Sequence, residues 1–141
     1  MTTANKVLIH RWFEEVWNKG RSAAIDEMLD RQGLVYGLTN NESKPIVGPA
    51  EFKPFHEKFK NAFPGLKVAV ESTLAEQDLV CARCSVRGTH SGETLGFPAT
   101  GRSVLMNGIC VARIKDGKIV EAWNNFDFLS LYQQLGAVKQ L

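Results

Sequence analysis

The chain has 141 residues, of which 44% are hydrophobic and 23% are charged, a balance that is typical of one globular domain and excludes a disordered chain. Its formal net charge is +2, and its 17 basic residues are scattered, which argues against a nucleic-acid partner because phosphate binding needs clustered positive charge. No apolar run is long enough to span a membrane, and the N-terminus carries no export signal. We therefore expect a cytoplasmic protein.

The first elements predicted along the chain are mainly helices. From Asn5 to Asn18 the apolar residues, Phe13 and Trp17 among them, fall on one broad stripe of a helix. The segments expected next are a second helix, a short strand and a polar loop, over Ala23 to Leu29, Leu34 to Leu38 and Thr39 to Lys44.

A third helix opens at Gly48-Pro49, since proline suits the first turn. Its phenylalanines recur at spacings that place them on one face: Phe52, Phe55, Phe59 and Phe63. Pro54 removes a backbone donor within the second turn, so we expect either a kink there or a regular helix that begins only near Lys53.

The second half of the chain predicts strands, and a final helix from Phe128 to Leu135 follows them. Four consecutive antiparallel strands are expected over Leu66 to Ala75, Leu79 to Thr89, Arg102 to Ile114 and Lys118 to Phe126. Helices on one face of an antiparallel sheet give an α+β architecture, and we assign residues 1–141 to one such domain. Because both faces of the last two strands carry apolar residues, we expect a homodimer formed through the sheet.

The cysteines and histidines predict no metal site. Cys81 and Cys84 form a CxxC pattern, but positions three apart on a strand face opposite sides of the sheet. The three histidines are far apart and lack metal-binding spacing. We expect His10 and His56 to be partly buried helix residues. For His90, before a glycine-rich loop, a loop-bracing role is favoured over a place at a pocket rim.

The turn at Lys115-Asp116-Gly117 predicts a pocket floor. We expect a three-residue loop with Gly117 as the bulge residue, because a two-residue Asp-Gly loop needs positive φ at both positions. This register and strand alternation place six residues on one face: Asn107, Ile109, Arg113, Trp123, Asn125 and Asp127. The expected walls are Phe13, Trp17, Phe55 and Phe59. Such an apolar set with a few polar groups is typical of a site for a small apolar molecule.

Four motifs occur in a characteristic order, at residues 88–93, 96–101, 116–123 and 133–136, with Asp127 before the last. Together they resemble the SnoaL-like polyketide cyclase family of the nuclear transport factor 2-like superfamily. The resemblance implies a cone-shaped barrel, in which N-terminal helices wrap a highly curved, mainly antiparallel sheet around an apolar cavity. It also implies intramolecular aldol condensation without metal or cofactor, in which a carboxylate aligned with Asp127 is the acid/base.

One position departs from the family pattern. Cyclases of this family carry a polar partner for the carboxylate, often histidine, on the preceding strand, and the matching position here is Arg113. Arginine cannot act as a base near neutral pH, but it can pair with Glu121 or bind an oxyanion.

Three hypotheses follow. In the first, Asp127 moves a proton next to a carbonyl group, and Asn125, Asn107 or Arg113 stabilises the developing oxyanion. In the second, the protein binds a small hydrophobic molecule without catalysis, and Asp127 only caps the last helix, a position that favours Asp. A third hypothesis is epoxide hydrolysis, which needs an Asp-Arg-Asp relay that Arg113 and Glu121 imitate in part.

Overall fold

The computed structural model describes residues 2–39 and 43–139. Within them, the helical segments are α1 (Thr2–Arg11), the π-helical η1 (Trp12–Asn18), α2 (Ser22–Met28), α3 (Gly48–Ala62) and α4 (Phe128–Gln134). The strands are β1 (Leu29–Tyr36), β2 (Ile46–Val47), β3 (Lys67–Glu76), β4 (Leu79–Thr89), β5 (Ser103–Lys115) and β6 (Lys118–Phe126). Residues 40–42 of the predicted polar loop over residues 39–44 lie outside the described residues.

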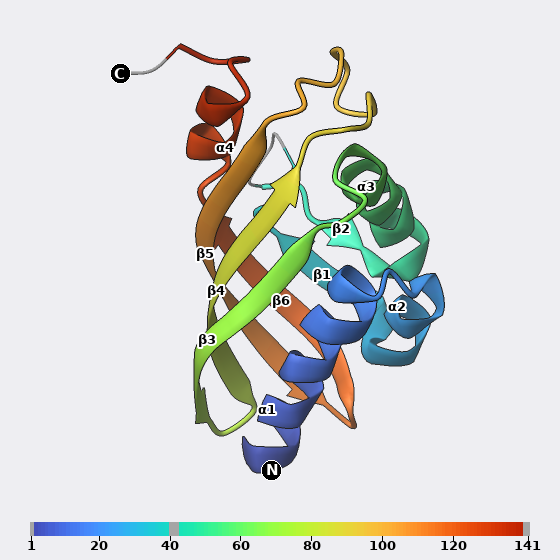
Figure 1. The fold of residues 1–141 in the computed structure, drawn as a ribbon. Coiled ribbons are helices and arrows are strands. Elements are labelled where there is room, and N and C mark those ends of the chain that lie inside the picture. Colours follow the sequence, from blue (N-terminus) through green and yellow to red (C-terminus); the bar gives the residue numbers. More distant parts are fainter. Residues whose placement is uncertain (1, 40–42, 140–141) are drawn as a thin grey trace.

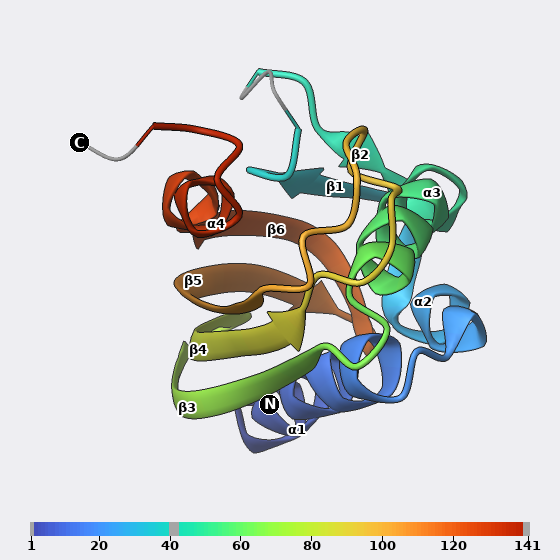
Figure 2. The same ribbon diagram turned by 45° about the horizontal axis from the view of Figure 1, so that its top comes forward.

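The strands form one curved sheet in the order β2-β1-β6-β5-β4-β3. All neighbours are antiparallel except β1 and β6, which run parallel. Figures 1 and 2 show α1, α2 and α3 on the concave side of the sheet, and Figure 1 shows α4 beside the upper part of β5. The predicted α+β class and curved, mainly antiparallel sheet are confirmed, and the sheet stays open between its edge strands β2 and β3.

Alternation along the strands gives the sheet two different faces. The inner face points toward the helices, and on β4 it carries the buried residues Val80, Ala82, Cys84 and Val86. The outer face carries the residues between them, so Cys81 is half-buried there while Cys84 is in the core. The expected separation of these two cysteines is confirmed, and the three thiols of the chain are free.

The first helix extends as predicted to Asn18, but its last seven residues are π-helical. Two side chains of α3 satisfy carbonyl groups of this segment: His56 Nε2 lies 2.6 Å from the carbonyl oxygen of Val16, and Lys60 Nζ donates to that of Trp17 at 2.9 Å. Burial lowers the pKa of both His56 and Lys60. His56 is therefore a structural residue, as expected, whereas His10 is exposed rather than partly buried.

Helix α3 runs without a break from Gly48 through Pro54. The alternative start near Lys53 is therefore wrong. Gly48 has a φ of 68°, and a Cβ there would lie 2.1 Å from the carbonyl oxygen of Arg31, so only glycine allows the helix to begin so close to β1. The buried face of α3 carries Phe52 and Phe59.

The β5–β6 turn has two residues, Asp116 and Gly117, between the paired Lys115 and Lys118. The three-residue loop predicted from the sequence is wrong. Asp116 and Gly117 both adopt positive φ, 51° and 73°, and such a turn matches the twist of the strands it joins. A bulge follows, so that Arg113 pairs with Glu121 rather than with Ile119. Because the net shift is two residues, the other predicted floor residues still share one face.

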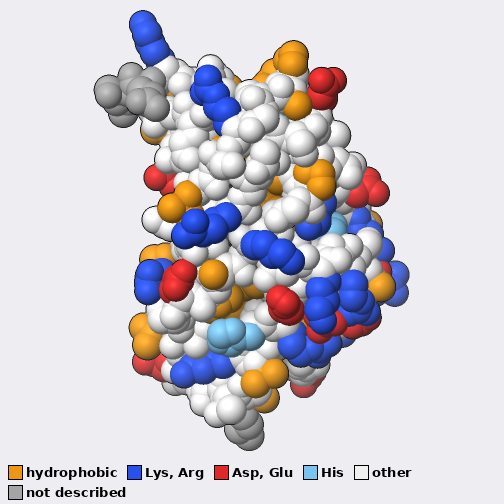
Figure 3. Space-filling view, in the orientation of Figure 1, with side chains coloured by type: hydrophobic (Ala, Val, Ile, Leu, Met, Phe, Trp, Pro, Cys, Tyr) orange, Lys and Arg blue, Asp and Glu red, His pale blue; other side chains and the backbone are white. Residues whose placement is uncertain are grey.

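The surface in Figure 3 carries Lys and Arg side chains interspersed with Asp and Glu. No helix among residues 2–39 and 43–139 is both long and apolar enough to cross a membrane.

Candidate functional site

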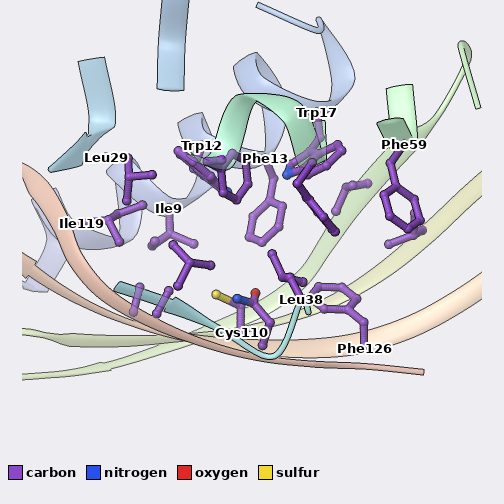
Figure 4. Close-up of a pocket in the computed structure, with 18 of the residues that line it drawn as sticks. Ile9, Trp12, Phe13, Trp17, Leu29, Leu38, Phe59, Cys110, Ile119 and Phe126 are labelled. Atoms are coloured by element: carbon purple, nitrogen blue, oxygen red, sulfur yellow. The ribbon is translucent and has the colours of Figure 1, made fainter. Parts of the chain in front are cut away.

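A cavity lies between the inner face of the sheet and the helices (Figure 4), with about 760 Å³ of space free of protein atoms, including the part open to solvent. The helices line it with aromatic side chains: Trp12, Phe13, Trp17, Phe52, Phe55 and Phe59. The sheet lines it with small side chains such as Cys110, Ala112 and Ala122, with the amide of Asn124, and with larger apolar side chains such as Met106, Ile119 and Phe126. The expected wall residues Phe13, Trp17, Phe55 and Phe59 are therefore all at the cavity.

The aromatic wall is a connected series of rings. The Trp12 ring meets the Phe52 ring edge-on with centroids 5.2 Å apart, and Trp17 meets Phe55 similarly at 6.1 Å. The Phe55 and Phe59 centroids are 4.8 Å apart, and Phe59 reaches Phe128 at the start of α4 at 5.9 Å. Tilted and edge-on rings are the favoured geometry for aromatic pairs, so one continuous apolar wall runs from η1 along α3 to α4.

The middle of β5 carries small residues on its inner face, which leaves room for neighbouring rings. Gly108 on β5 is the clearest case, since a Cβ there would lie 2.1 Å from the ring of Phe126. Phe126, on β6, lines the cavity, as Figure 4 shows. A larger residue at position 108 would displace this ring.

Polar groups are few in the cavity. Among its described lining residues, Asn124 alone carries an amide, and none carries a carboxylate, an imidazole or an ammonium group. The Cys110 thiol is buried, and burial raises its pKa to about 12, so it stays protonated near neutral pH. An uncharged ligand with a largely apolar surface fits this lining best.

Asp127 lies between two cavity-lining residues, Phe126 and Phe128, but its own side chain is exposed. Its Oδ1 accepts a hydrogen bond from the backbone N–H of Ser130 at 3.0 Å, which caps α4. Its backbone N–H donates to the carbonyl oxygen of Asn107 at 3.0 Å, and so ties the start of α4 to β5. The capping geometry predicted for Asp127 is confirmed.

The other predicted floor residues lie together on the outer face. Asn107, Ile109 and Asn125 are exposed there, and Trp123 is half-buried with its ring stacked on Tyr36 at a centroid distance of 6.4 Å. None of the four lines the cavity. Their expected position beneath the ligand was wrong, because alternation groups residues by face but does not tell which face the helices cover. The inner-face neighbours are instead Cys110, Ala112, Ala122 and Asn124.

Comparison with known proteins agrees with this architecture. The model of the SnoaL-like polyketide cyclase family matches residues 7–135. The chain belongs to the SnoaL-like polyketide cyclase family.

The chain is 31% identical over 123 residues to the aklanonic acid methyl ester cyclase of Streptomyces peucetius, a match that covers 86% of this chain and 84% of the relative. The enzyme of the same name from Streptomyces sp. (strain C5) is also 31% identical over 123 residues, with 86% and 76% covered. A solved candidate polyketide cyclase from Streptomyces antibioticus has a TM-score of 0.80 and 28% identity, with 94% of this chain and 98% of that chain covered. A candidate hydroxylase from Streptomyces galilaeus has a TM-score of 0.85 and 29% identity, with 100% and 86% covered.

Arg113 occupies the position where the family resemblance led us to expect a polar partner for Asp127. Its Nη1 donates to Asp78 Oδ1 and Oδ2 at 2.9 and 3.0 Å, and its Nε donates to Glu121 Oε1 at 3.2 Å. These hydrogen bonds, the one to Asp78 above all, raise the pKa of Arg113. The predicted pairing with Glu121 is confirmed, and Asp78 in the β3–β4 turn adds a second carboxylate. This Asp-Arg-Glu cluster does not line the cavity, so it offers no relay to a molecule bound there.

His90 of this SnoaL-like chain braces the loop that follows β4. The side chain is fully buried, and its Nδ1 accepts the backbone N–H of Thr100 at 3.1 Å. The ring lies between those of Phe63 and Phe97, each 5.4 Å away. The loop-bracing interpretation is confirmed, and His90 is not among the cavity-lining residues.

Asn124, Cys110 and Ala112 line the cavity but were not predicted as site residues. One signal was available: Gly108, Cys110, Ala112 and Ala122 form a run of small residues on one face of β5 and β6. A helix stripe rich in phenylalanine and tryptophan needs a facing surface of small side chains to leave space. The face with small residues was therefore the inner one.

Proposed function

We propose that this SnoaL-like protein is a cofactor-independent cyclase, which closes a ring in a small polyketide-type carbonyl compound held in the cavity. The observation that carries the proposal is the cavity itself, an uncharged, aromatic-walled space in a chain related to named cyclases. A flexible carbonyl compound folded in such a space brings its own reactive carbons together. Because binding already holds the two reacting groups together, much of the entropic part of the activation barrier is overcome before the reaction begins.

The proposed chemistry is an intramolecular aldol addition with Asp127 as the acid/base. The carboxylate removes a proton from a carbon that lies between two carbonyl groups, and the resulting enolate carbon attacks another carbonyl carbon of the same molecule. One C–H bond breaks, one C–C bond forms, and the new alkoxide takes the proton back from the carboxylic acid of Asp127. Nothing is oxidised or reduced, so the atoms and electrons balance within the substrate and this side chain.

Three features support Asp127 for this role. It lies between Phe126 and Phe128, both of which line the cavity. Its Oδ1 caps α4, while no described group donates a hydrogen bond to Oδ2, so one oxygen keeps its acceptor capacity. The described lining residues include no carboxylate or imidazole that would compete for the role. The reacting carbon would have to lie near Phe126 and Phe128 while the rest of the substrate fills the cavity.

The test compares Asp127→Asn with the wild type, using aklanonic acid methyl ester as the first probe because two relatives are named for it. Asn caps a helix as well as Asp but cannot exchange a proton, so the rate of ring closure followed by chromatography should fall by roughly 10²- to 10⁴-fold. Asp116→Asn is the matched control, since it makes the same change in the exposed β5–β6 turn and should keep the wild-type rate. An Asp127→Asn variant with full activity would remove Asp127 from the mechanism.

Non-catalytic binding of a small hydrophobic molecule is the second candidate function. It is favoured by one observation, that the Asp127 side chain is exposed and already accounted for as the cap of α4. In that case the wild type would bind the probe without converting it, and Asp127→Asn would leave its dissociation constant unchanged. Quenching of tryptophan fluorescence measures this binding, because Trp12 and Trp17 line the cavity.

A further inference from the structure

Asn124 carries the one amide among the described residues that line the cavity, whose other side-chain polar groups are the Cys110 thiol and the indole N–H groups of Trp12 and Trp17. It lies on the inner face of β6, paired with Cys110 of β5, between Ala122 and Phe126 along its own strand. The backbone at Asn124 is closely packed: a Cβ on Gly37 would lie 1.9 Å from the carbonyl oxygen of Asn124. The position of this side chain is therefore set by the fold rather than by a mobile loop.

The orientation of the Asn124 amide follows from its one hydrogen bond. Nδ2 donates to the carbonyl oxygen of Tyr36 at 3.0 Å, at the end of β1. The flipped amide would place Oδ1 against that carbonyl oxygen, and two acceptors repel each other. The amide nitrogen is thus engaged by the protein, while no described side chain or backbone group donates to Oδ1.

The surroundings of Asn124 offer Oδ1 no strong donor. Its β5 neighbour Cys110 carries a thiol, which is only a weak donor. The remaining nearby lining groups, Ala122 and Phe126 among them, are apolar. A ligand with a hydrogen-bond donor should therefore bind more tightly than one without it. A ligand that lacks a donor would leave Oδ1 unpaired in the filled cavity, and this lowers the affinity.

We propose that Asn124 sets the specificity of the cavity by accepting a hydrogen bond from a ligand hydroxyl group, so that the preferred ligands are apolar compounds with a phenolic or enolic O–H. The enol tautomer of a β-dicarbonyl compound meets this requirement, whereas its diketo form does not. The inference rests on the part of the proposed function that concerns binding in the cavity, and it does not depend on catalysis by Asp127.

The experiment uses two probes of nearly equal shape, 2-naphthol and 2-methylnaphthalene, which differ in a hydroxyl group against a methyl group. Their dissociation constants are measured by quenching of the fluorescence of Trp12 and Trp17. The readout is the ratio of the two constants in each protein, since the cost of removing each probe from water cancels when ratios are compared between proteins. In Asn124→Leu the preference for 2-naphthol should fall by roughly tenfold, the worth of one hydrogen bond.

Two further variants separate selection of the hydroxyl group from a structural role. Asn124→Asp keeps an acceptor but loses the donor to Tyr36, so it should retain the preference for 2-naphthol; a residue that only braced Tyr36 would affect both variants alike. Asn125→Leu makes the same change one residue along, on the outer face, and should keep the wild-type ratio. Asn124→Met, with an unbranched side chain, replaces Asn124→Leu where the latter does not fold.

The possible outcomes are distinct. If neither probe binds the wild type, both the cavity-binding proposal and this inference are overturned. If both probes bind and the ratio is the same in the wild type and Asn124→Leu, binding in the cavity stands and the role of Asn124 is overturned. A loss of preference in Asn124→Leu that Asn124→Asp does not share supports the inference.

Discussion

The two faces of the same strands differ in a way that explains both the site and the errors in predicting it. On β5 and β6 the inner face carries Cys110, Ala112 and Ala122, and aromatic rings from the helices fill the space above them. The outer face carries larger and more polar residues such as Trp123 and Arg113. The smallest residues of β5 and β6 thus lie on the inner face opposite the helix aromatics, together with larger apolar residues such as Met106 and Phe126.

The largest expected difference between the faces is in stability, and two isoleucines of β5 measure it. Ile114, 4% exposed on the inner face, should lose about 2–5 kcal/mol of unfolding free energy when changed to alanine, because the deletion leaves a cavity in the core. Ile109, 44% exposed on the outer face of a single chain, should lose within about 0.5 kcal/mol on the same change when the protein is dilute enough to be monomeric. Urea denaturation of the two variants provides the comparison, and equal losses would show that the outer face is as fully covered as the inner one.

Thiol reactivity should separate the faces next. Burial raises the pKa of Cys84 to about 11 and that of Cys110 to about 12, from an ordinary value near 9.0. A higher pKa means less thiolate at a given pH, so at pH 8 each of these groups should react at least about a hundredfold more slowly than a free thiol, and burial blocks access as well. Cys81, half-buried on the outer face, should react alone in the native protein with a disulfide reagent that releases a coloured thiolate.

The control is the denatured protein, in which all three cysteines should react. Rapid modification of two or more thiols in the native protein would mean that the inner face opens readily to solvent.

The elements and faces were predictable because each rests on local periodicity. The phenylalanine spacing of α3 and the alternation along β4 are properties of a few neighbouring residues, and both appear in the structure as expected. The two faces of the β5–β6 hairpin were grouped correctly even though the turn was misjudged, since the bulge near Ile114 and the shorter turn shift the register by two residues.

What the sequence did not reveal is which face the helices cover, because that depends on contacts between distant segments. Trp123 and Asn125 were placed beneath the ligand on the strength of their own chemistry, while Asn124 between them was overlooked. A strand with apolar residues on both faces leaves this choice open. Here the helix aromatics, Trp12 and Phe52 for example, settle it by packing over the face with small side chains.

The outer face of the sheet carries exposed apolar residues on β5. We propose that a second copy of the chain covers it, because Leu105 and Ile109 are exposed on β5 at 43% and 44%. Ile109→Arg would bury an unpaired charge in such an interface and should raise the dissociation constant of the homodimer by at least about tenfold. Sedimentation at micromolar concentration measures it, with Ile109→Val as the control that keeps the apolar surface. A wild-type monomer at that concentration would contradict the proposal.

The smallest expected effect concerns Asp127, which lies between the end of β6 and the start of α4. Asp127→Ala removes the acceptor for the Ser130 N–H and should lower the unfolding free energy by about 1 kcal/mol, whereas Asp127→Asn keeps an acceptor and should change it by only a few tenths. Thermal unfolding of both variants isolates the capping role, and ring closure measured on the same samples isolates the proton transfer. If activity follows stability, with Asp127→Asn active and Asp127→Ala impaired, Asp127 serves only α4. If both variants are inactive although only one is destabilised, the carboxylate has a chemical role that capping does not explain.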